Sequence, residues 1–128
     1  MTTVLVVEDS ITQRQMISSL LKDSGLSVTV ACDGVEALEQ IARNCPDLVV
    51  LDIVLPRMNG YEVCRKIKSD SKTHDLAVVM CSTKREEFDR YWGMKQGADA
   101  YIAKPFEAHE LIGTVKQLLR ETTAARRG

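Results

Sequence analysis

Five polar or charged side chains stand directly after short apolar runs in this sequence. Glu8 and Asp9 follow one run, Asp52 follows a second, and Ser82 and Lys104 follow two later ones. Three carboxylates that lie close together repel one another unless a cation neutralises them. A small, hard divalent ion with oxygen ligands suits such a group, and Mg²⁺ fits this chemistry. The set therefore predicts a magnesium site, provided that the fold brings the residues together.

The same residues are suited to phosphoryl chemistry. A carboxylate such as Asp52 can act as a nucleophile and form an aspartyl phosphate. Mg²⁺ can bridge Asp52 to the oxygens of an incoming phosphoryl group. Lys104 can place a point charge on one phosphoryl oxygen, and Ser82 can donate its hydroxyl to another. Taken alone, an aspartate at a strand end is more often a helix cap or a solvated turn, so the prediction rests on the whole set.

These side chains meet only if the apolar runs are parallel strands of one sheet. The runs alternate with longer segments of helical periodicity, which is typical of an α/β protein with a doubly wound, mostly parallel sheet. Ligands of such sheets gather beyond the carboxyl ends of the strands. We expect five strands near residues 4–7, 27–31, 48–51, 77–81 and 100–103, and helices within 10–25, 34–44, 61–69, 85–96 and 107–120.

The fourth predicted helix contains half of the six aromatic side chains of the sequence. Phe88, Tyr91, Met94 and Ala98 can form one stripe, and we expect this stripe to pack in the core. Trp92 lies about 100° around the helix from Tyr91, which predicts partial exposure. Two interpretations of Trp92 remain open: it packs at the edge of the core, or it anchors a partner protein.

Composition favours one soluble domain. The chain has 128 residues, 45% of them hydrophobic, and a formal net charge of −1, which indicates neither a nucleic-acid partner nor insertion into a membrane. No secretory signal opens the sequence, and no apolar run approaches the roughly 20 residues that cross a bilayer. We expect a cytoplasmic protein with one domain over residues 1–121 and a short polar tail over 122–128. Four scattered cysteines predict reduced thiols: Cys32, Cys45, Cys64 and Cys81.

In this order the polar residues resemble the receiver domain of two-component response regulators, in its CheY-like, single-domain form. The resemblance runs from about Thr2 to Arg120 and implies a flavodoxin-like sheet with strand order 2-1-3-4-5. Its motifs are Val7–Ser10, Leu51–Ile53 with Pro56 and Gly60, Cys81–Thr83, Gly97–Tyr101 and Lys104–Phe106. The stretch Tyr91–Asp99 is similar to regulators of chemotaxis-like pathways for pilus motility or phototaxis.

The resemblance also implies a role for each site residue. Glu8, Asp9, Asp52 and the backbone carbonyl of Val54 would hold Mg²⁺, and Asp52 would be the phosphoacceptor of a histidine kinase. Lys104 would contact the phosphoryl group, with the Lys104–Pro105 bond cis.

Two further residues would transmit the signal. Ser82 would be the switch hydroxyl and Tyr101 the switch aromatic. The segments 85–96, 100–103 and 107–120 would form the face that binds a downstream target protein.

Two positions depart from the usual pattern of the family. Glu8 replaces an aspartate and has a longer reach, and Thr83 replaces a smaller residue, which narrows access to the phosphoryl group. Val54 and Lys84 stand at the positions that tune hydrolysis of the phosphate. Because an apolar Val54 cannot orient a water molecule, we expect a longer phosphate lifetime than a polar residue would give.

Other functions fit parts of the sequence. A phosphatase that forms an aspartyl phosphate often has a second aspartate two positions after the nucleophile, where this chain has Val54. We therefore expect no enzyme with an external substrate, only self-phosphorylation from a phospho-donor and autodephosphorylation. A phosphate sink and a phosphorylation-independent binding module remain as alternatives to an output regulator.

Overall fold

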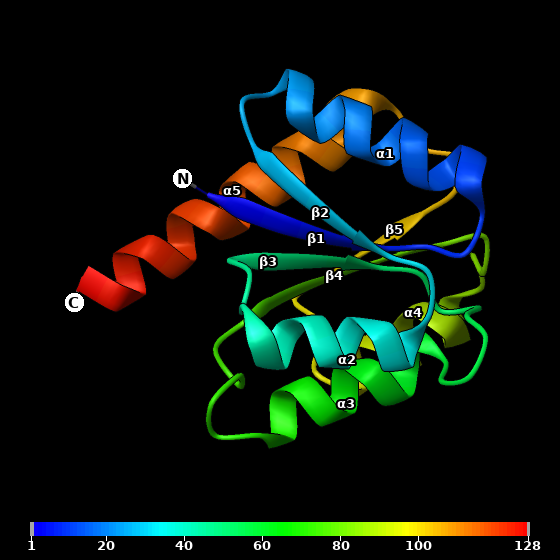
Figure 1. Cartoon of the computed structure of the whole chain (residues 1–128). Coiled ribbons are helices and arrows are strands. Elements are labelled where there is room, and N and C mark those ends of the chain that lie inside the picture. Colours follow the sequence, from blue (N-terminus) through cyan, green and yellow to red (C-terminus); the bar gives the residue numbers. More distant parts are fainter. Residues whose placement is uncertain (1, 128) are drawn as a thin grey trace.

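The computed structural model describes the backbone of residues 2–127 and the side chains of residues 2–122. Five parallel strands form one sheet in the order β2-β1-β3-β4-β5, with helices on both faces (Figure 1). This confirms the predicted doubly wound, flavodoxin-like fold. The elements are β1 (Thr3–Val7), α1 (Ile11–Asp23), β2 (Ser27–Ala31), α2 (Gly34–Arg43), β3 (Leu48–Leu51), α3 (Gly60–Ser69), β4 (Ala77–Ser82), α4 (Glu87–Lys95), β5 (Ala100–Ala103) and α5 (Ala108–Arg127).

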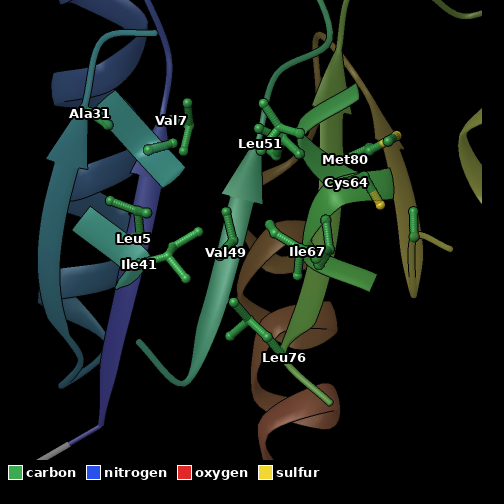
Figure 2. Close-up of a cluster of buried hydrophobic side chains, with 14 of the residues drawn as sticks. Leu5, Val7, Ala31, Ile41, Val49, Leu51, Cys64, Ile67, Leu76 and Met80 are labelled. Atoms are coloured by element: carbon green, nitrogen blue, oxygen red, sulfur yellow. The ribbon is translucent and has the colours of Figure 1, made fainter. Parts of the chain in front are cut away.

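The core has one layer on each face of the sheet, because successive residues of a strand point to opposite faces. In β1, Leu5 and Val7 pack with α2 and α3, as Figure 2 shows for this layer. Val4 and Val6 pack on the other face with α1 and α5. The three central strands are therefore apolar on both faces, as expected of covered parallel strands.

Polar side chains cap the first three helices next to the carboxyl ends of the strands. The side chains of Ser10, Asp33 and Asn59 accept hydrogen bonds from the third backbone amide of α1, α2 and α3, respectively. Each cap satisfies an amide that lacks a partner within its helix. The turns after β1, β2 and β3 are thereby fixed close to the edge where the predicted site lies.

The predicted core stripe of α4 is wrong. Phe88, Tyr91 and Met94 are 69%, 58% and 43% exposed, and Trp92 is 40% exposed, as expected for that residue. Within α4 the buried residue is Gly93, where a Cβ atom would lie 2.7 Å from the sulfur of Met80 and 3.1 Å from the ring of Tyr101. The helix contacts the sheet through this glycine, which turns the large apolar side chains toward solvent; Ala98, beyond the helix end, is buried as predicted.

Helix α5 is longer than predicted. It continues from Ala108 to Arg127 instead of ending at Arg120, so the predicted polar tail is helical up to Arg127. Alanine and arginine favour the helix, and the expected tail contains two of each. No helix among the described residues is long and apolar enough to span a membrane.

Candidate functional site

The sheet brings the predicted site residues to one edge. The hydrogen-bond ladder continues one residue beyond the strands: the amide of Asp52 donates to the carbonyl of Val7 at 3.1 Å, and the amide of Lys104 donates to the carbonyl of Ser82 at 2.8 Å. Because β1, β3, β4 and β5 are adjacent in the sheet, their carboxyl ends lie side by side. The side chains that follow them share one site.

Three carboxylates form an acidic cluster in this site. One oxygen from each of Glu8, Asp9 and Asp52 lies within 4.8 Å of the other two. Glu8 and Asp52 are buried, whereas Asp9 is exposed and opens the cluster to solvent. Oxygen ligands on a partly open site are what Mg²⁺ requires, because this ion retains several of its waters. The donor set therefore fits a magnesium ion.

A buried ammonium compensates part of this negative charge. Lys104 Nζ contacts Glu8 Oε1 in a direct ion pair and lies 3.6 Å from Asp52 Oδ2. Burial lowers the pKa of Lys104, but the hydrogen bond to Glu8 and the charge of Asp52 outweigh burial and raise the pKa above its ordinary value. Lys104 therefore stays charged inside the site. The Lys104–Pro105 peptide bond is cis, as the resemblance implied.

The remaining carboxylate oxygens also have partners. Glu8 Oε2 accepts a hydrogen bond from the amide of Ser10 at 3.1 Å, and Asp52 Oδ1 accepts one from the amide of Ile53 at 2.7 Å. The carboxylate of Glu8 thus bridges the backbone of the turn before α1 and the ammonium of Lys104. Asp52 Oδ2 is the oxygen of Asp52 that faces the ammonium.

The two predicted switch residues meet at the backbone of Lys84. The hydroxyl oxygen of Ser82 accepts a hydrogen bond from the Lys84 amide at 3.3 Å, and the hydroxyl of Tyr101 donates to the Lys84 carbonyl. Both side chains are buried. Burial, with a smaller contribution from the neighbouring Tyr61, raises the pKa of Tyr101 to about 12. Sequence analysis had assigned Lys84 only to phosphate hydrolysis and missed this link.

Arg90 of α4 also holds Tyr101. Its guanidinium lies 5.5 Å from the centre of the Tyr101 ring and donates to the Tyr101 carbonyl at 3.3 Å. No sequence motif indicated this contact, because it depends on how α4 packs against β5. Together with Lys84, Arg90 fixes the aromatic ring beside the helix.

The loop after β3 fits tightly against the phosphoacceptor candidate. The amide of Gly60 donates to the carbonyl of Ile53 at 2.8 Å, and a Cβ atom on Gly60 would lie 2.2 Å from the carbonyl oxygen of Asp52. Only glycine allows this approach. Val54 lies in the same loop with an exposed side chain. Its carbonyl remains a predicted metal ligand.

Comparison with known proteins identifies the class. The response regulator receiver domain model matches residues 4–116, so the chain belongs to this family of two-component receiver domains. Receiver domains are phosphoacceptors, not enzymes in the usual sense. They bind Mg²⁺ in an acidic pocket and interact with a histidine kinase and with downstream targets.

Two relatives match this chain over different shares of their own length. The chain is 41% identical to Protein PilG of Pseudomonas aeruginosa over 113 residues, which cover 88% of the chain and 84% of PilG. It is 42% identical over 120 residues to Response regulator MprA of Mycobacterium sp. (strain KMS), covering 94% of the chain and 51% of MprA. The chain thus spans about half the length of MprA.

Solved structures agree with the fold. A response regulator from Chloroflexus aurantiacus superposes with a TM-score of 0.90 at 35% identity, over 93% of this chain and 98% of the other. Chemotaxis protein CheY4 of Vibrio cholerae superposes with a TM-score of 0.85 at 32% identity, over 92% and 98% of the two chains. The CheY-like architecture is therefore shown.

The buried ion pair makes a stability prediction. Replacing Lys104 with Met leaves the carboxylate of Glu8 buried without its partner, and we expect the free energy of unfolding to fall by about 3 kcal/mol. The double variant Glu8→Gln/Lys104→Met removes both charges and should recover most of this loss. Urea unfolding at neutral pH measures the effect.

An exposed lysine provides the control for this experiment. Lys95→Met on α4 should change the free energy of unfolding by no more than about 0.5 kcal/mol. If the double variant were as unstable as Lys104→Met alone, the ion pair would not be the cause.

Proposed function

We propose that Asp52 is the phosphoacceptor of this receiver domain and that a histidine kinase phosphorylates it in a Mg²⁺-dependent reaction. The observation that carries the proposal is the position of Asp52 in the acidic cluster with Glu8 and Asp9, with Oδ2 3.6 Å from the ammonium of Lys104. Asp52 has positive charge beside it, and the exposed Asp9 opens the cluster to solvent. Asp52 can therefore receive a phosphoryl group.

The transfer requires one new bond and one broken bond. A carboxylate oxygen of Asp52 attacks the phosphorus atom of a phosphohistidine, and the P–O bond forms as the P–N bond breaks. The departing imidazole nitrogen keeps the electron pair. Bound at Glu8, Asp9, Asp52 and the Val54 carbonyl, Mg²⁺ would neutralise phosphoryl oxygens during the transfer.

Two side chains would stabilise the product. Lys104 needs only a small movement to place its ammonium on a phosphoryl oxygen, because Asp52 Oδ2 already lies 3.6 Å away. Ser82 uses its hydroxyl oxygen as an acceptor for Lys84, so its own proton is available for a second phosphoryl oxygen. Ser82 ends β4, which lies next to β3 in the sheet, and Lys104 follows β5, one strand further along.

The backbone of Lys84 offers a route from the phosphoryl group to the surface. A movement of Ser82 toward the phosphoryl group would pull on the Lys84 amide, and the Lys84 carbonyl holds the hydroxyl of Tyr101. Tyr101 packs beneath Gly93 of α4. We therefore propose that phosphorylation changes the surface formed by α4, β5 and α5.

The exposed aromatic side chains of α4 suit a protein partner at that surface. Phe88 and Trp92 stack with their ring centres 6.4 Å apart, and Tyr91 lies beside Lys95. Tryptophan and tyrosine are enriched among the residues that dominate binding energy in interfaces. We propose that a downstream target protein binds here, and that the protein works in the cytoplasm, where the exposed thiols of Cys32 and Cys45 stay reduced.

Intact-mass spectrometry tests the phosphoacceptor. After incubation with acetyl phosphate and Mg²⁺, the wild type should gain the mass of one phosphoryl group, and chelation of Mg²⁺ should prevent the gain. Asp52→Asn should show no adduct while keeping a cooperative unfolding transition. An adduct on Asp52→Asn, or none on the folded wild type with acetyl phosphate or a histidine kinase, would contradict the proposal and favour a phosphorylation-independent binding module.

The exposed valine two residues after Asp52 makes a kinetic prediction. Because Val54 cannot orient an attacking water molecule, Val54→Asn should hasten autodephosphorylation, by about tenfold if the amide positions the water. The decay of the phosphorylated mass after removal of the donor gives the rate. Val30→Asn, at an exposed valine on β2, is the matched control and should decay like the wild type. Equal rates for all three proteins would refute a role for Val54.

A further inference from the structure

The loop between β3 and α3 contains a residue with an unusual backbone conformation, Arg57, which is not part of the acidic cluster. Arg57 has a φ angle of 66°, and among residues 2–127 it is the one residue other than glycine with a positive φ. The left-handed conformation is unfavourable for a residue with a Cβ atom and persists where surrounding contacts impose it. The contacts of Arg57 therefore show what holds the loop in this shape.

Arg57 binds the carboxylate of Asp33 through two nitrogens of its guanidinium, Nε and Nη2. Nε donates to Oδ2 at 3.1 Å, and Nη2 lies 3.0 Å from Oδ1 and 2.9 Å from Oδ2. Asp33 also caps α2 by accepting from the amide of Glu36 at 2.8 Å. This amide, together with Arg57, holds the pKa of Asp33 below its ordinary value, so the carboxylate stays charged at neutral pH.

The backbones of the loop and of α2 are also in contact. A Cβ atom on Gly34, the first residue of α2, would lie 2.3 Å from the carbonyl oxygen of Met58. The amide of Met58 closes a tight turn by donating to the carbonyl of Pro56 at 2.7 Å. The loop is thus attached to the start of α2.

Val54 lies between two fixed points of this loop. On one side Ile53 is bonded to Gly60, and on the other Arg57 is bonded to Asp33. We propose that the Asp33–Arg57 ion pair is a positioning device, which fixes the loop so that the carbonyl of Val54 faces the acidic cluster. This inference rests on the proposed function, in which that carbonyl is a ligand of Mg²⁺. Neither Asp33 nor Arg57 belongs to the residues that would hold the ion, so both would act through the backbone.

Two substitutions break the ion pair and leave the local backbone intact. Asp33→Asn keeps a side-chain oxygen that can cap α2, and Arg57→Gly adopts the left-handed conformation without steric strain. Titration of each purified protein with MgCl₂ in a calorimeter gives the dissociation constant of Mg²⁺ without any phosphorylation. We expect both variants to bind Mg²⁺ about threefold to fivefold more weakly, which is the upper range for an exposed ion pair.

The direction in which Arg57→Gly changes the affinity for Mg²⁺ distinguishes a positioning role from a direct electrostatic effect. Loss of a nearby positive charge would by itself strengthen the binding of a cation, and loss of the Asp33 charge would weaken it. A positioning role instead predicts weaker binding in both variants. It also predicts that the double variant is no weaker than either single one, because both changes remove the same interaction.

Asp75→Asn is the control for overall charge, since it removes an exposed carboxylate in the loop between α3 and β4. It should bind Mg²⁺ like the wild type. Wild-type or tighter binding by Arg57→Gly would overturn the positioning role and leave the phosphoacceptor proposal standing. Absence of Mg²⁺ binding in the wild type would overturn both.

Discussion

The site depends on one electrostatic constraint: a buried ammonium must lie among carboxylates that the sheet forces together. Parallel strands bring Glu8 and Asp52 to the same edge, and both are buried. Removing such charges from water is costly unless they are paired. Lys104 follows β5, which β4 separates from β3, and its ammonium supplies the positive charge that pairs with Glu8. The topology and the chemistry are therefore linked, because any other strand order would place this lysine elsewhere.

The same edge connects the site to a weakly attached helix. Most helices of the fold bury large apolar side chains, but α4 contacts β4 and β5 through Gly93 and turns its aromatic residues outward. Arg90 of α4 donates a hydrogen bond to the Tyr101 carbonyl, and the Tyr101 hydroxyl donates to the carbonyl of Lys84, which precedes the helix. Elements with few buried apolar contacts open at low free energy. The proposed movement of Ser82 would for this reason reach a large exposed surface.

The sequence was sufficient for the features that depend on local pattern. Continuous apolar runs predicted the strands, and the residues after them predicted the cluster of Glu8, Asp52 and Lys104; the resemblance supplied the strand order. The sequence pattern failed for features that tertiary packing determines. The aromatic stripe of α4 has core-like spacing, yet the glycine sets which side of the helix meets the sheet. The Asp33–Arg57 pair joins residues 24 positions apart, and no spacing rule predicts it.

Heteronuclear NMR of the ¹⁵N-labelled protein tests the central claim, that one edge of the sheet binds the metal and signals to α4. Addition of MgCl₂ should shift amide resonances around Glu8 to Ser10, Asp52 to Leu55 and Lys104. Subsequent addition of acetyl phosphate should extend the shifts to Lys84, Tyr101 and α4. Shifts confined to other exposed acidic loops, or a phosphorylated protein with unchanged α4 resonances, would contradict the account.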